Sequence, residues 1–276
     1  MGLLNEGEPR PACETPQPLI LVRSLIPNRV PVLIASIVFA VSSANGQNYE
    51  IDFNFDQHGA ALISGSSVPS AQPYGNLFGG GEGVRVSTDS PGVRPLNYYN
   101  TEGSTGEDPD LERNSEGTGL WEGGNLLGGN FGNVLIVNKN DTLTTPNDNG
   151  GGGKIILEFD RELVAFGFDF VDMDQASSAS VIFGSGPGAV EVEFAAFESG
   201  SGSIHSVSGV SFGDRHANRI LDIRADELGL SSFSRVEFDL ASSGGIGTVY
   251  VETIPEPASF YFGVLGLAAL CLRRRR

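Results

Sequence analysis

Cysteine and lysine are almost absent from this sequence of 276 residues. The two cysteines are Cys13 and Cys271, and both lie near the ends of the chain. A disulfide therefore cannot stabilise the middle of the chain, which must depend on its own core and on any bound ions. A middle segment of about 200 residues is large enough for this, because it can bury about 70% of its unfolded surface.

Positive charge is also scarce, with 17 basic residues against 34 acidic ones and a net charge of -17. Residues 1–46 hold three acidic residues and three arginines, and residues 255–276 hold one acidic residue and four arginines. The middle of the chain therefore keeps 30 acidic and 10 basic residues. Such a surface repels nucleic acid and anionic lipid and attracts divalent cations, so we expect no nucleic-acid role.

The first apolar run lies near the N-terminus. Arg23 and Arg29 precede an apolar segment over residues 30–41, and small residues follow it. If cleavage occurs before Gln47, Ala44 and Gly46 occupy the −3 and −1 positions that signal peptidase selects. Residues 1–46 are therefore predicted to be an N-terminal extension with a signal peptide.

The second apolar run closes the chain. It covers residues 260–272 and is shorter than the roughly 20 residues that a full membrane span needs. The proline-flanked tripeptide before it is predicted to be extended, because proline disfavours helix at the preceding residue. The motif and the basic stop are made of these residues: Pro255, Glu256 and Pro257, then Arg273, Arg274, Arg275 and Arg276.

This order of motif, short transmembrane helix and arginines resembles the PEP-CTERM sorting signal of certain Gram-negative bacteria. The resemblance implies that an integral-membrane exosortase recognises the tripeptide and removes the tail after transient anchoring in the inner membrane. An ordinary C-terminal tail anchor is the alternative. The chain is thus predicted to comprise the extension and signal peptide (1–46), one exported domain (47–253) and the sorting signal (254–276).

The exported part has the pattern of a β protein. Apolar and polar residues alternate from Tyr49 to Asp56, and glycine-rich and serine-rich turns separate many short segments of this kind. We expect about nine or ten strands in an antiparallel β-sandwich or jelly roll. Two of the predicted strands, 155–159 and 163–174, are expected to pair through a short turn. The others include 84–87, 134–138, 190–197, 206–212, 220–224, 233–240 and 248–253.

The strand from residue 163 carries a phenylalanine at every second position, and these rings are expected on one core face: Phe166, Phe168 and Phe170. The same parity places Asp172 and Asp174 on that face as the strand ends. Carboxylates at the rim of a core are unfavourable unless they are paired or bind a metal. Two interpretations stay open: solvated turn residues, or ligands of a Ca²⁺ ion.

Further acidic turns are Asp108-Pro109-Asp110 and the Asn-Asp-Asn sequence around Asp148. An EF-hand loop beginning at Asp108 fails, because Arg113 stands at its sixth position and Gly119 at its twelfth. Any calcium site, with Asp108, Asp110, Asp148, Asp172 and Asp174 as candidate ligands, must therefore be assembled from distant segments.

The order of these motifs is similar to that of a domain common in exported PEP-CTERM proteins. The succession consists of residues 107–111, 132–137, 146–152 and the Phe-rich strand ending at Asp174. The resemblance implies a jelly-roll domain with an extracellular, non-enzymatic role. The chain departs from that pattern at Asn147 and at Gly247-Thr248, where an aspartate is common, which predicts a weaker metal site.

Residues for catalysis are few. His58, His205 and His216 lack metal-ligand spacing, and no G-x-S-x-G sequence is present. No enzyme is therefore expected, although paired carboxylates of a secreted hydrolase are not excluded by spacing.

Three aromatic residues are candidates for stacking on a sugar ring, or for packing loops onto the sheet: Tyr98, Tyr99 and Trp121.

The sequence thus predicts an exported structural or adhesive protein of the cell surface or extracellular (biofilm-type) matrix, with Ca²⁺ as the expected ion. Signal peptidase and exosortase are the expected partners during export, and extracellular polysaccharide is a partner considered outside the cell. The alternatives are a secreted carbohydrate-binding module and, less favoured, a secreted hydrolase.

Overall fold

The computed structural model describes residues 46–68, 74–89, 94–102, 108–113, 120–139 and 145–254. Within these ranges no helix is long and apolar enough to cross a membrane. The predicted signal peptide, apart from Gly46, and the predicted sorting motif, transmembrane helix and arginines lie outside the described residues.

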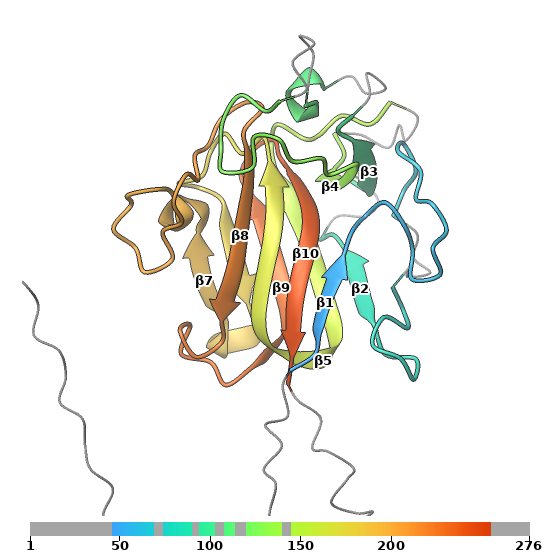
Figure 1. The fold of residues 1–276 in the computed structure, drawn as a ribbon, viewed down its shortest axis with the longest axis vertical. Helices are drawn as coiled ribbons and strands as arrows, with labels where there is room; N and C mark the ends of the chain where they lie inside the picture. Colours follow the sequence, from blue (N-terminus) through green and yellow to red (C-terminus); the bar gives the residue numbers. More distant parts are fainter. Residues whose placement is uncertain are drawn as a thin grey trace, which may run out of the picture. The chain divides into compact units, whose positions relative to one another are not determined.

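The described part of the chain is all-β and forms a curled antiparallel sheet of ten strands (Figure 1). Its main path has the order β3-β4-β10-β5-β9-β6-β7, while β1 pairs with β10 and both β2 and β8 pair with β5. The strands are β1 (Asn48–Ile51), β2 (Val84–Ser87), β3 (Leu96–Asn100), β4 (Asn133–Val137), β5 (Gly153–Val171), β6 (Ser180–Phe183), β7 (Val190–Glu193), β8 (Ala217–Arg224), β9 (Phe233–Leu240) and β10 (Gly245–Thr253). Three short 3-10 turns complete the elements: η1 (Pro109–Leu111), η2 (Gly186–Gly188) and η3 (Phe194–Phe197).

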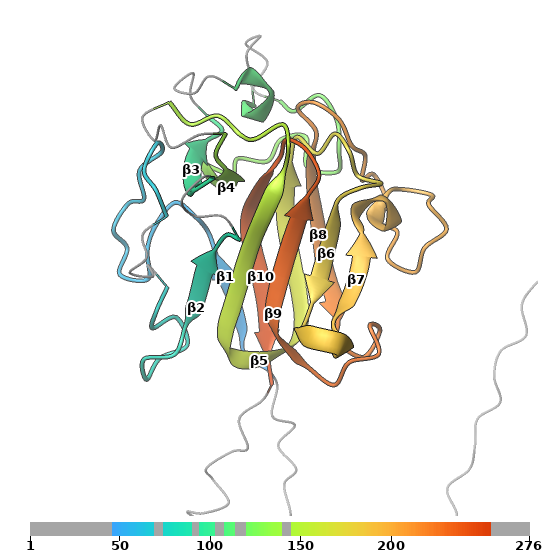
Figure 2. The same cartoon turned by 180° about the vertical axis from the view of Figure 1, so that it is seen from behind.

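Strand β5 connects the two halves of the sheet. Its first part pairs with β2 and β9, and its second part pairs with β10 and β8. Figure 2 shows β2, β5, β9, β6 and β7 side by side on one side of the molecule. The pairing with β9 changes register between Glu158 and Leu163, where β5 curves from one half of the sheet to the other.

The prediction of two paired strands at 155–159 and 163–174 is therefore wrong. The backbone continues as one strand, because Asp160 donates its N–H to Gly83 and Glu162 accepts from Ile254. Hydrogen bonds to neighbouring strands thus hold the backbone on both sides of the expected turn. The two segments lie in different halves of the sheet and do not pair with each other.

The core lies inside this curl, and the predicted phenylalanine face is confirmed. Phe166, Phe168 and Phe170 are each at most 1% exposed. The Phe168 ring lies 5.0 Å from that of Phe238 on β9 and 5.8 Å from that of Phe194 on η3. Edge-to-face ring pairs of this kind add about 0.5–1.5 kcal/mol each beyond the burial of apolar area.

Candidate metal centre

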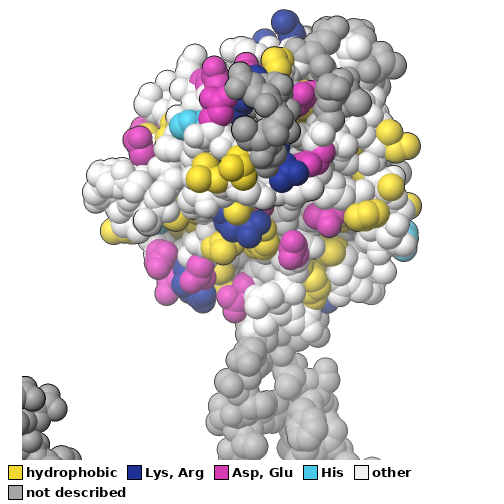
Figure 3. Space-filling view, turned by 45° about the horizontal axis from the view of Figure 1, so that its top comes forward, with side chains coloured by type: hydrophobic (Ala, Val, Ile, Leu, Met, Phe, Trp, Pro, Cys, Tyr) yellow, Lys and Arg dark blue, Asp and Glu magenta, His cyan; other side chains and the backbone are white. Residues whose placement is uncertain are grey.

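Several chain segments from distant parts of the sequence meet at one end of the sheet, at the top of Figure 1. Strand β5 ends there, and β8 and β10 begin there, because both run antiparallel to the second part of β5. The turn η1 lies over the same end. Figure 3 looks obliquely onto it and shows acidic side chains spread among the loops, with arginines between them.

Asp172 is the most deeply buried aspartate of this end that the sequence singled out. It directly follows β5 and is 1% exposed, so its carboxyl is buried at the end of that strand. Its backbone leaves the strand conformation with a φ of 57°, which aspartate tolerates better than most residues. One carboxylate oxygen accepts a hydrogen bond of 3.3 Å from the backbone N–H of Arg215.

Asp172, Asp174 and Asp214 form a compact set. One carboxylate oxygen from each lies within 4.8 Å of the others. Two ligands on opposite sides of a Ca²⁺ ion are at most about 5 Å apart, so three oxygens at this separation can share one ion. Asp174 also accepts a hydrogen bond of 3.1 Å from the Ser243 hydroxyl, in the loop before β10.

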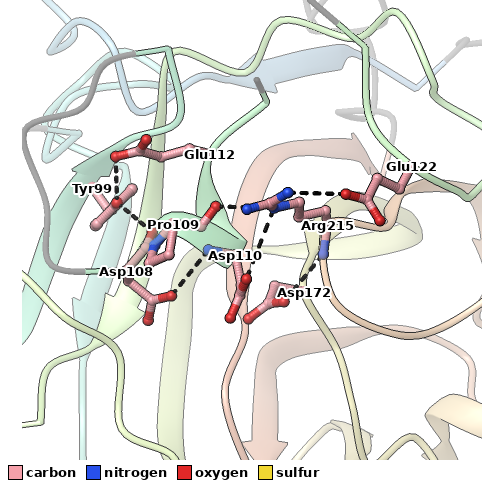
Figure 4. A network of polar contacts seen from close by, with 8 residues as sticks. All are labelled: Tyr99, Asp108, Pro109, Asp110, Glu112, Glu122, Asp172 and Arg215. Carbon is pink, nitrogen blue, oxygen red and sulfur yellow. Dashed lines mark hydrogen bonds and ion pairs between the residues drawn. The ribbon is translucent and has the colours of Figure 1, made fainter. Parts of the chain in front are cut away.

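The other two predicted acidic turns reach the same place. Asp108 and Asp148 are 8% and 5% exposed, and Asp108 is among the groups that raise the pKa of Asp148. Asp148 also accepts from the backbone N–H of Gly244, in the same loop as Ser243. Asp110 lies between these groups and Arg215, whose guanidinium is 3.8 Å from its carboxylate (Figure 4).

All five aspartates that the sequence proposed as metal ligands therefore lie at one end of the sheet, although they come from three separate stretches of the chain. The structure adds Asp214, which sequence reasoning missed. Its position in a Gly-Asp turn just before β8 is a weak signal that many surface turns share. Only the tertiary structure brings it to Asp172 and Asp174.

Burial and then the neighbouring carboxyl groups raise the pKa values of four of these aspartates. Burial, followed by the hydrogen bond to Asp108, raises the pKa of Asp148 to about 9. Burial and the negative charge of Asp174 raise the pKa of Asp172 to about 8. The pKa values of Asp110 and Asp174 are also raised, first by burial and then by Asp214. Buried like charges disfavour one another and raise the pKa values, and a bound cation would lower these pKa values again.

Arg215 supplies positive charge beside the cluster. It has a φ of 57°, and its guanidinium contacts the Pro109 carbonyl at 3.3 Å and the Glu122 carboxylate at 2.9 Å (Figure 4). These contacts link the loop before β8 to η1. One arginine balances a single negative charge, so it cannot compensate the six aspartates when all of them are ionised.

The aromatic residues considered for sugar stacking are in the interior. Tyr98, Tyr99 and Trp121 are 1%, 0% and 3% exposed. Trp121 donates its indole N–H to Gly129 and packs against Phe131, at a ring distance of 5.7 Å. Buried rings have no free face for a sugar, which argues against the stacking interpretation. The alternative, that the rings pack loops onto the sheet, describes only Trp121, because Tyr98 and Tyr99 lie on β3 itself.

No family model matches this chain, and no curated protein matches it significantly.

Proposed function

We propose that this protein is an exported structural or adhesive component of the cell surface or extracellular matrix, and that Ca²⁺ stabilises it. The observation that carries the calcium part is the convergence of six aspartates at one end of the sheet. Carboxylate oxygens are the ligands that Ca²⁺ prefers, and three of the six side chains are at least nine-tenths buried.

The ion would link segments that are distant in the sequence. Asp172 and Asp174 follow β5, Asp214 precedes β8, and Asp148 is hydrogen-bonded to the loop before β10. An ion bound to these groups would join the ends of three strands and η1. A chain whose two cysteines lie far outside this region can obtain from an ion the cross-linking that other exported proteins obtain from disulfides.

The export part of the proposal depends on the two ends of the sequence. Signal peptidase would remove residues 1–46, and an exosortase would recognise Pro255-Glu256-Pro257 and remove the tail.

We further propose that the curled sheet is a β-sandwich of the jelly-roll kind. The contact between Phe168 on β5 and Phe238 on β9 supports this, since no residue of β5 beyond Leu163 pairs with β9.

Thermal unfolding of the full-length chain in Ca²⁺ and in EDTA tests the calcium part. Binding to the native state stabilises it by about 2.7 kcal/mol at a concentration about 100 times Kd. For a domain of this size we expect the midpoint to rise by roughly 5–10 °C. An unchanged midpoint at millimolar Ca²⁺ would remove the ion from the proposal.

The mass and N-terminal sequence of the protein recovered from producing cells test the export part. We expect the mature chain to begin at Gln47 and to lack the arginine tail. An unprocessed chain in the cytosol would contradict export, and a processed N-terminus with a retained tail would favour the ordinary tail anchor.

A further inference from the structure

The peptide bond between Asp108 and Pro109 lies at the edge of the aspartate cluster and is the one Asp–Pro bond in the sequence. An aspartate can attack its own backbone carbonyl, because its carboxylate oxygen closes a five-membered ring on that carbon. Such intramolecular reactions are fast when the folded chain holds the groups in the reactive geometry. Asp108 is 8% exposed, so the surrounding protein fixes its side chain.

The Asp108 carboxylate is held by η1, whose N-cap it is. One carboxylate oxygen of Asp108 accepts a hydrogen bond of 3.3 Å from the backbone N–H of Asp110 (Figure 4). Since that N–H follows Pro109, the carboxylate must lie alongside the Asp108–Pro109 peptide bond to reach it. Carboxylates act as covalent nucleophiles in several enzyme classes.

The carbonyl under attack has a hydrogen-bond donor. The Tyr99 hydroxyl donates to the Asp108 carbonyl oxygen at 2.6 Å, and it also lies 3.0 Å from the Glu112 carboxylate. The hydroxyl has one proton, and its shorter contact is to the carbonyl. A donor placed on a carbonyl oxygen stabilises the oxyanion that forms when the carbon is attacked.

The leaving side of the bond is also fixed. Pro109 supplies the nitrogen of the bond as a tertiary amide, which carries no N–H. Its own carbonyl oxygen accepts from the backbone N–H of Glu112 at 3.2 Å and from the Arg215 guanidinium at 3.3 Å. The proline is therefore held in place on η1 while the carboxylate, the carbonyl and the Tyr99 hydroxyl are held on the other side of the bond.

We propose that the folded protein cleaves its own chain between Asp108 and Pro109. The Asp108 carboxylate oxygen bonds to the Asp108 carbonyl carbon, the bond to the Pro109 nitrogen breaks, and that nitrogen takes a proton from water. The resulting hydroxide opens the cyclic anhydride, which leaves two carboxylates on Asp108. The proton released in this step moves to the new prolyl amine, so one water is consumed and no oxidant or metal is needed.

Cleavage would leave the fold assembled. Strands β1, β2 and β3 precede the bond, and each pairs with a strand that follows it: β10, β5 and β4. The product would be two chains held together by these three strand pairs. Its fragments would separate only under denaturing conditions, so cleavage would not be detected in a protein prepared under native conditions.

The test is mass spectrometry, under denaturing conditions, of the full-length chain after incubation in EDTA at neutral pH. EDTA keeps cations off Asp108, which also belongs to the candidate metal centre. We expect two fragments, one ending at Asp108 and one beginning at Pro109, whose masses sum to the intact mass plus one water. Hydroxylamine, which traps anhydrides, should leave a hydroxamate on Asp108.

Three controls show whether the fold drives the reaction. Tyr99→Phe keeps the ring and removes the donor, and it should slow cleavage by about 100-fold. Asp108→Ala removes the nucleophile and should abolish cleavage at this position. The same chain unfolded in urea at the same pH should cleave far more slowly. An intact chain, equal rates in the folded and unfolded protein, or an unchanged rate in Tyr99→Phe would each overturn the proposal.

Discussion

Asp172 shows why a single side chain could be identified from sequence while its environment could not. The alternation of Phe166, Phe168 and Phe170 predicted that Asp172 continues the core face. Asp172 is buried, at 1% exposure, but its positive φ ends the alternation, and Met173 joins the phenylalanines in the core. The strand period does not reveal which groups approach from other segments. Asp214 lies in an unremarkable turn, and only the return of β8 alongside β5 brings it near.

Replacing Asp172 by Asn removes a buried carboxyl group, with its raised pKa, at almost constant volume. In EDTA we expect unfolding to require more free energy, on the order of 2 kcal/mol, because a desolvated carboxyl beside other acids is unfavourable. In Ca²⁺ the same variant should lose most of the stabilisation by the ion. Chemical denaturation measures both effects. Asp226→Asn, with a side chain 82% exposed, is the control and should leave both values unchanged.

The pH dependence of the ion-free protein follows from the raised pKa values. Asp172 and Asp148 have folded pKa values of about 8 and about 9, above the value of about 3.9 in an unfolded chain. The folded state therefore binds more protons between these limits, and the free energy of unfolding falls as pH rises from about 4 to about 9. Denaturation in EDTA along this pH series measures it, and stability that rises instead would contradict the burial of these groups.

Among the secondary-structure elements, strand β5 was predicted correctly in one respect and wrongly in another. Its phenylalanine period gave the core face correctly, but its curve was mistaken for a hairpin turn, because Asp160 and Glu162 are exposed and polar. Strands β3 and β6 were missed, because their residues are mostly buried and show no alternation. The predicted strand at 206–212 is absent, since a turn bonds Val210 to Val207 and Ser211 bonds to the Asn218 side chain.

The core face of β5 should dominate stability. Phe168 has ring neighbours on β5, β9 and η3, so Phe168→Ala leaves a cavity that several rigid elements surround. We expect a loss of about 3–5 kcal/mol in the free energy of unfolding. Leu221→Ala on β8, at a side chain that is 52% exposed, should cost less than about 1 kcal/mol. Equal losses in the two variants would contradict this location of the core.

At the scale of the whole molecule, composition predicted the class of fold and the attraction for cations, and the acidic clusters predicted candidate ligands. The sequence did not predict how the segments that carry these aspartates are arranged in space. The aspartates of η1, of the loop before β5 and of the end of β5 meet because a ten-stranded antiparallel sheet returns its ends to the same side. Sheet order depends on which strands pair across long sequence separations, and no local pattern records that.

The central claim is that these aspartates hold Ca²⁺, and diffraction from crystals grown with Ca²⁺ tests it most directly. An anomalous difference peak is expected among Asp172, Asp174 and Asp214, with carboxylate oxygens at about 2.3–2.6 Å and six to eight oxygen ligands in all. Density without anomalous signal, or a peak that these three carboxylates do not contact, would contradict the account.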